Sequence, residues 1–196
     1  MKVILASSSK QRKEIFDRLG IKYEIMTSDV EEYSNKKEPK EYVKELSRNK
    51  AHSVKEKLNE KAIIIASDAV ICFENKIYEK PKTKEEAFNN MKEMSGKMTQ
   101  AVTGITILDM YQDKEISMAD VADVKFFEID DEDIRWYVEN EKNVLNCCGY
   151  TVLGKASIFL EKVDGDYNTL IGISPSRVYN MLKELGYKIS DFELKD

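Results

Sequence analysis

The stretch "AIIIASDAVICF", residues 62–73, carries the strongest strand pattern of the chain together with one acidic side chain. Five almost continuously apolar residues lead to Ser67 and Asp68, and the apolar run then resumes, which predicts a buried strand. In α/β sheets, ligands gather at the carboxyl ends of strands. Asp68 is therefore a candidate site residue, and its alternative role as a turn former is weakened because the strand pattern continues beyond it.

Alternating strand and helix patterns surround this stretch. Strands are expected at 2–6, 21–26, 76–79, 98–111 and 115–129, the last two joined by a hairpin at the polar segment 112–115. Helices are expected at 9–19, 39–58, 84–95, 130–139 and from residue 175 to Gly186. Two further strands, 150–154 and 156–163, and a turn at 164–168 complete the pattern. It predicts an α/β or α+β fold with a mixed sheet.

Composition limits the class of protein. The 196 residues are 42% hydrophobic and 34% charged, which suits one globular unit with one good core. There is neither an apolar run of 18 residues nor a signal-peptide pattern, so we expect a soluble, cytoplasmic protein without membrane contact. Because 36 acidic residues outnumber 31 basic ones, no global basic field is available to hold nucleic acid.

Several catalytic chemistries are excluded by residue counts and missing motifs. His52 is the only histidine, which excludes two-histidine metal motifs, and its charged helical surroundings predict a solvent-facing side chain. Glycine-rich dinucleotide and Walker A patterns are absent. Three cysteines, including the adjacent Cys147 and Cys148, form no disulfide framework and are expected to be small buried hydrophobes. Any chemistry is left to carboxylates, lysines and arginine.

Two cations lie on helix stripes that should be buried. Arg12 precedes Ile15 and Phe16 on the first helix, and Lys50 falls between Leu46 and Val54 at four-residue steps on the second. A snorkelling stem is the ordinary explanation for one such residue. Two of them on different helices indicate a shared cleft.

The order of short motifs along the chain resembles the Maf family of nucleoside triphosphate pyrophosphatases, once called septum-formation inhibitors. The matching segments span nearly the whole chain: "LASSS" (5–9) with Arg12, "DVEE" (29–32), "RNKA" (48–51), "SD" (67–68), "KP" (80–81), "SGK" (95–97) with "TG" (103–104), "GY" (149–150), and "GDYNTLIGISP" (165–175). The resemblance implies one domain, 1–196, with a mixed twisted sheet and two lobes around a central cleft, similar to inosine triphosphate pyrophosphatases. It also implies a homodimer and hydrolysis of a nucleoside triphosphate to monophosphate and pyrophosphate with Mg²⁺ or Mn²⁺.

The resemblance also assigns roles to individual residues. It makes Asp68 the proton acceptor and, with Glu32, the metal-linked carboxylate. The serine loop would cradle phosphate at a helix N-terminus, and three cations would clamp the phosphates. These residues are Ser7 and Ser9 in the loop, and Arg12, Lys50 and Lys80 as the cations.

Three positions at which the family distinguishes bases depart from the dTTP/UTP type. They are Gln11, Ala69, where the family commonly has threonine, and Leu153, where it has glutamine. Loss of a hydroxyl and an amide removes hydrogen-bond partners for a base edge, so an altered or broader base specificity is expected.

Two other classes of function stay open. One is a nucleotide-binding regulator of cell division or septum formation with impaired catalysis, which the departure at Lys10 and Gln11 from the family's Pro-Arg makes plausible. The other is a structural or interaction module, which leaves Arg12, Lys50 and Asp68 unexplained.

Overall fold

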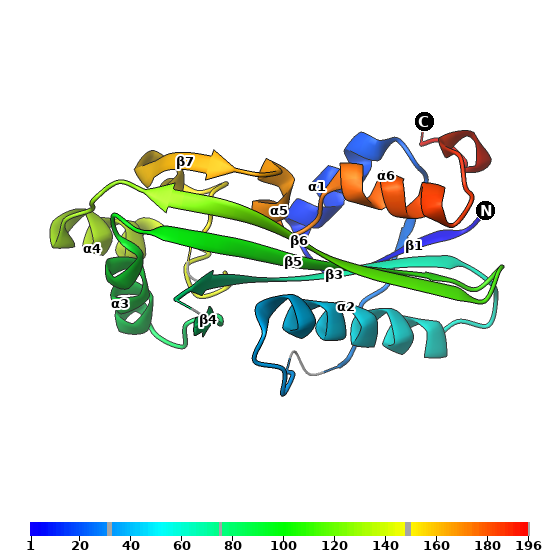
Figure 1. Cartoon of the computed structure of the whole chain (residues 1–196), viewed down its shortest axis with the longest axis horizontal. Coiled ribbons are helices and arrows are strands. Elements are labelled where there is room, and N and C mark those ends of the chain that lie inside the picture. The colour runs from blue at the N-terminus through cyan, green and yellow to red at the C-terminus, as the bar shows by residue number, and fades with distance from the viewer. Residues whose placement is uncertain (31–32, 75, 148–149, 196) are drawn as a thin grey trace. The chain divides into compact units, whose positions relative to one another are not determined.

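The computed structural model describes residues 1–30, 33–74, 76–147 and 150–195, and these residues confirm the expected mixed α/β fold (Figure 1). Their strands form a seven-stranded sheet of order β2-β1-β3-β5-β6-β7, with β4 beside β3. β1 pairs in parallel with β2 and β3, whereas β4 and β7 pair antiparallel with β3 and β6. The strand bounds are β1 Val3–Ala6, β2 Glu24–Ile25, β3 Ile63–Phe73, β4 Lys76–Tyr78, β5 Met98–Asp109, β6 Lys114–Phe126 and β7 Leu160–Asp164.

The helices begin where the sequence provides caps. Side-chain oxygens of Ser9, Thr83, Asp130 and Ser174 each accept a first-turn N–H. The helices are α1 Lys10–Leu19, α2 Pro39–Glu56, α3 Lys84–Met94, α4 Asp131–Asn140, α5 Tyr167–Ile171 and α6 Pro175–Glu184, with 3₁₀ turns η1 Lys155–Phe159 and η2 Ile189–Asp191. None of the helices in the described part of the chain is both long and apolar enough to cross a membrane.

The chain divides into two compact units. Unit 1 contains Met1–Asp68, Thr103–Asp120 and Ile171–Asp196, and unit 2 contains Ala69–Val102 and Val121–Leu170. That both belong to a single domain stays a prediction from the family resemblance.

In unit 1, helices cover both faces of the strands, with α1 and α6 on one side and α2 on the other (Figure 1). Successive residues of a strand point to opposite faces. Accordingly Ile63 and Ile65 pack in a cluster with Phe16 of α1 and Val178 of α6. The intervening residues, Ile64 and Ala66, pack in a second cluster with Ala51 and Val54 of α2. The alternation therefore fixes which helix each residue of β3 faces.

In unit 2, α3 and α4 pack side by side over a single apolar cluster. Met91 and Met94 of α3 and Ile134 and Tyr137 of α4 are fully buried there. The Tyr137 ring meets that of Phe159 edge to face, with 6.2 Å between centroids.

Some expected strands are wrong. Residues 150–154 form a turn, although Tyr150 and Val152 are buried in strand-like alternation. The reason is local: the carboxylate of Glu141 accepts the N–H groups of Asn143 and Lys155, which holds this segment in a compact loop. Of the strand expected at 156–163, the first half is η1, and only 160–164 joins the sheet as β7.

Two other expectations hold in part. Of residues 21–26, only Glu24–Ile25 pair as a strand. The turn expected at 164–168 gives way at Tyr167 to α5.

Candidate active site

A buried ion pair joins α2 to β3. The Lys50 ammonium donates to the Asp68 carboxylate, and these residues are only 6% and 7% exposed. Asp68 lies two residues beyond Ala66 and therefore faces α2, where the apolar stripe carries Lys50. A buried cation of this kind needs a partner charge, and Asp68 supplies one.

Arg12 of α1 contacts the same middle part of β3. Its Nη1 donates to the carbonyl oxygen of Ser67 at 2.9 Å, and its Nε donates to that of Gly172 at 3.1 Å. Gly172 has φ +102°, and a Cβ there would lie 3.0 Å from Arg12 Nη2, so the glycine leaves room for the guanidinium. Two helices thus bring one cation each to the consecutive residues Ser67 and Asp68.

The serine loop lies where β1 stops and β3 continues. Ala6, the last residue of β1, pairs with Ala66, so Ser7 follows at the level of Ser67. Ser7 Oγ accepts the Ser9 N–H at 3.1 Å. Unpaired N–H groups and the helix dipole make the N-terminus of α1 favourable for an anion.

The Ser9 side chain contacts the backbone and one side chain of the first turn of α1. Ser9 Oγ accepts the Arg12 N–H at 3.4 Å and donates to Gln11 Oε1 at 3.0 Å. Gln11, a predicted base-selecting residue, therefore contacts the serine that caps α1.

Unit 1 thus brings together six predicted site residues: Ser7, Ser9, Gln11, Arg12, Lys50 and Asp68. The other described ones belong to unit 2. There Lys80 is exposed in the loop after β4, Ala69 is half-buried on β3, and Leu153 is 50% exposed in the 150–154 loop. Glu32 lies outside the described residues.

Sequence reasoning missed a buried acid in unit 1. Asp120 of β6 is 7% exposed, and its Oδ1 accepts from Arg177 Nε of α6 at 3.0 Å. The signal was present, because the buried residues Ala122, Val124 and Phe126 follow Asp120 at two-residue steps. An acid that continues an inward-facing strand stripe requires a partner, and this partner comes from a distant helix.

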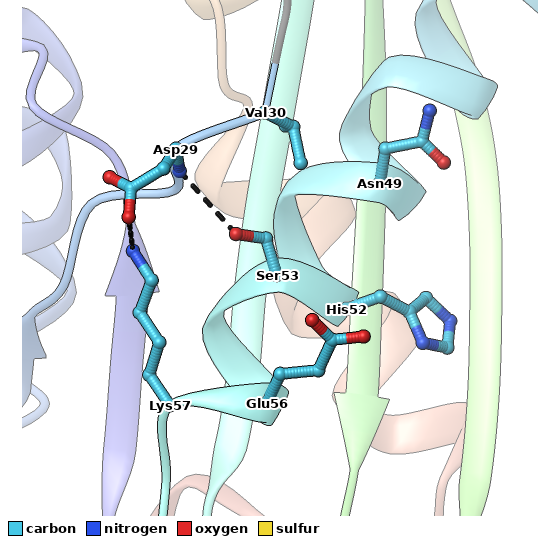
Figure 2. A pocket seen from close by; sticks show the side chains of 7 residues that line it. All are labelled: Asp29, Val30, Asn49, His52, Ser53, Glu56 and Lys57. Atoms are coloured by element: carbon cyan, nitrogen blue, oxygen red, sulfur yellow. Dashed lines mark hydrogen bonds and ion pairs between the residues drawn. The ribbon is translucent and has the colours of Figure 1, made fainter.

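A pocket of about 430 Å³ lies elsewhere in unit 1, between α2 and the segment before residue 31. Figure 2 shows its lining side chains: Asp29, Val30, Asn49, His52, Ser53, Glu56 and Lys57. The Asp29 N–H donates to Ser53 Oγ at 3.4 Å, and the Asp29 carboxylate pairs with Lys57 at 2.6 Å. None of the predicted site residues that the structure describes lines this pocket, and its two carboxylates, Asp29 and Glu56, disfavour a triphosphate.

His52 is exposed, as its charged surroundings predict, and its Nε2 lies 2.6 Å from Glu115 Oε2. Among the described residues, no three histidine, cysteine, aspartate or glutamate side chains gather closely enough to hold a metal ion.

Comparison with known proteins gives a consistent result. A family model described as "Maf-like protein" matches residues 2–185. A dTTP/UTP pyrophosphatase of Thermoanaerobacter sp. (strain X514) is 37% identical over 183 residues, which cover 93% of this chain and 96% of that protein. A dTTP/UTP pyrophosphatase of Fusobacterium nucleatum is 34% identical over 189 residues, covering 96% and 97%. The solved structure of a HAM1 protein from Coxiella burnetii is similar with TM-score 0.46 and 14% identity, covering 64% and 73%.

Proposed function

The chain belongs to the family of Maf-like proteins, and from this premise we propose that it hydrolyses a nucleoside triphosphate to the monophosphate and pyrophosphate. Its relatives named dTTP/UTP pyrophosphatases support this reaction. The observation that carries the proposal is the buried Lys50–Asp68 pair next to the serine loop and Arg12. A carboxylate, two cations and a helix N-terminus are the groups that phosphoryl chemistry needs.

In the proposed mechanism, Asp68 orients a water and accepts its proton as the water attacks the α-phosphorus. Lys50 has three donor protons, so it can donate to Asp68 and still donate to a phosphate oxygen. Arg12 and the N-terminus of α1 stabilise the charge that builds on the phosphates and on the departing pyrophosphate. Lys80 is proposed as a further phosphate ligand on the family resemblance alone.

A divalent cation, Mg²⁺ or Mn²⁺, is part of the proposal. Magnesium is commonly held by one or two carboxylates together with substrate phosphates and water, so the residues present fit it without a larger protein cluster. Asp68 would hold the ion together with Glu32. When bound, the ion would neutralise phosphate charge.

We also propose a base specificity altered from the dTTP/UTP type, because Ala69 and Leu153 lack the polar groups that the family usually has there. Both are accessible in unit 2, one half-buried and the other exposed. A homodimer and a cytoplasmic location complete the proposal. The first is tested by light scattering on the purified protein, and the second by fractionation of cells.

The deciding experiment measures pyrophosphate and nucleoside monophosphate release from a panel of canonical, methylated and otherwise modified triphosphates, with Mg²⁺, Mn²⁺ or a chelator. We expect equal amounts of both products, and none with the chelator. The same panel, with binding of each triphosphate also measured, tests the regulator, which the departure at Lys10 and Gln11 from the family's Pro-Arg leaves open. If the protein binds a triphosphate but releases neither product, the enzyme proposal is rejected in favour of the regulator. If the protein binds no triphosphate, both proposals are rejected.

A further inference from the structure

The backbone of α2 approaches β5 more closely at Gly104 than any other residue type would permit. A Cβ on Gly104 would lie 2.8 Å from the backbone nitrogen of Lys44 and closer still to the carbonyl group of Val43. These are backbone atoms of a helix, which cannot rotate away as a side-chain end can. Only glycine therefore lets α2 lie at this depth on the strands of unit 1.

A row of three hydroxyl groups, two buried and one half-buried, fixes α2 along the same strand. Ser47 Oγ lies 2.8 Å from Thr106 Oγ1, which in turn lies 2.8 Å from Ser117 Oγ of β6. One arrangement gives each of these contacts a proton: Ser47 donates to the carbonyl oxygen of Lys44, Thr106 to Ser47, and Ser117 to Thr106. These directional bonds determine the register of the helix, whereas apolar contacts alone would let it slide.

The packing of α2 on β5 determines where Lys50 lies. Val43, Ser47 and Lys50 occupy positions i, i+4 and i+7 and so share one face of the helix. The first two contact β5, and the third meets Asp68 on β3, the neighbouring strand. A helix held further out or shifted along the strands would withdraw the Lys50 ammonium from the Asp68 carboxylate.

We propose that Gly104 is a positioning residue for the reaction: by admitting the backbone of α2, and with Thr106 fixing its register, it places Lys50 against Asp68 and the substrate phosphates. The inference rests on the proposed function. It assigns Gly104 no contact with the substrate.

The main test is Gly104→Ala, with product release measured under the conditions that work for the wild type. We expect kcat/KM to fall about a hundredfold, mostly through kcat, because a displacement of about 1 Å in a reacting group has an effect of this order. Leu185→Ala is the control for lost stability, since it removes buried apolar contact at the residue that follows α6. It should lose stability and keep kcat/KM within about twofold.

If Gly104→Ala does not fold, Thr106→Val is used to test the proposal instead. Valine keeps the shape of threonine but cannot donate to Ser47, and we expect kcat/KM to fall about tenfold. If Gly104→Ala folds, its full activity would overturn the proposal. If Gly104→Ala does not fold, full activity of Thr106→Val would overturn it.

A readout independent of activity is the coupling of Lys50 to Asp68. Urea unfolding of Lys50→Met, Asp68→Asn and the double variant measures this coupling in the wild-type and Gly104→Ala backgrounds, or in Thr106→Val. We expect the coupling to disappear in the Gly104→Ala or Thr106→Val background, where the packing of α2 on β5 is altered. An unchanged coupling would overturn the inference. If the wild type released no pyrophosphate, the proposed function would fail, and this coupling would still decide the role of Gly104.

Discussion

Lys50 and Asp68 are buried together, each as the other's counter-charge, although they belong to different elements of unit 1. Such a pair stabilises the fold little compared with an apolar pair of similar volume, because both charges lose their hydration. Loss of either partner alone removes a counter-charge from a buried ion. A pair that contributes little net stability is best understood through what its charges can do to a ligand.

Asp68→Asn keeps the shape of the side chain but removes the charge that accepts the proton. We expect product release to fall at least about a thousandfold, within the range of general-base contributions. The free energy of unfolding should also fall, by about 3 kcal/mol, because the buried Lys50 ammonium then loses the Asp68 carboxylate as a counter-charge.

The control is Lys50→Met combined with Asp68→Asn. It removes both charges, so it should recover most of the stability and none of the activity. Wild-type turnover in Asp68→Asn would refute the role assigned to this carboxylate.

Arg12→Lys keeps the positive charge but loses the planar fork that donates to the carbonyl oxygens of Ser67 and Gly172. We expect kcat/KM to fall about tenfold to a hundredfold, in line with one or two hydrogen bonds made by a charged group. Arg18→Lys, at an exposed position in the last turn of α1, is the control and should behave as wild type. Equal activity of the two variants would show that Arg12 acts through its charge alone.

Base preference is tested by Leu153→Gln and Ala69→Thr, which introduce the polar groups usual in the family. If these positions select the base, kcat/KM for dTTP and UTP relative to purine triphosphates should rise about tenfold or more. Leu145→Gln gives a matched control, because Leu145 is also an exposed leucine of unit 2. A rise of similar size in Leu145→Gln would mean that the change is not specific to position 153.

Local patterns predicted most of the helices, including α2, which begins at the expected Pro39 and ends two residues before the expected Leu58. The pattern also indicated that Lys50 lies on the buried stripe. It could not identify Asp68 as the partner, because that contact depends on how α2 packs on β3. The 150–154 segment shows the opposite case, in which Tyr150 and Val152 alternate like a strand but the carboxylate of Glu141 holds the backbone in a loop.

The last prediction concerns how the end of the chain is held to α1. Lys195 Nζ donates to Asp17 Oδ1 at 2.5 Å, and the Tyr23 hydroxyl donates to the same oxygen at 2.6 Å. These two bonds hold the pKa of Asp17 below its ordinary value of 3.8, and the bond from Lys195 has the larger effect. Because the unfolded chain then binds the proton more readily, the stabilisation is present above about pH 4 and is lost as the pH falls through the lower, folded pKa.

Urea unfolding of the wild type and Asp17→Asn between about pH 7 and about pH 2 checks this sign. The difference in unfolding free energy should be constant at neutral pH and should shrink in acid. Lys195→Met should reproduce much of the effect, since the Lys195 bond is the largest cause of the lowered pKa, and Tyr23→Phe should reproduce less. A difference that stays constant down to pH 2 would mean that the Asp17 carboxylate is not held by these partners in solution, and that the terminal segment is fixed by its backbone bonds, Lys22 N–H to Glu193 and Lys195 N–H to Gly20.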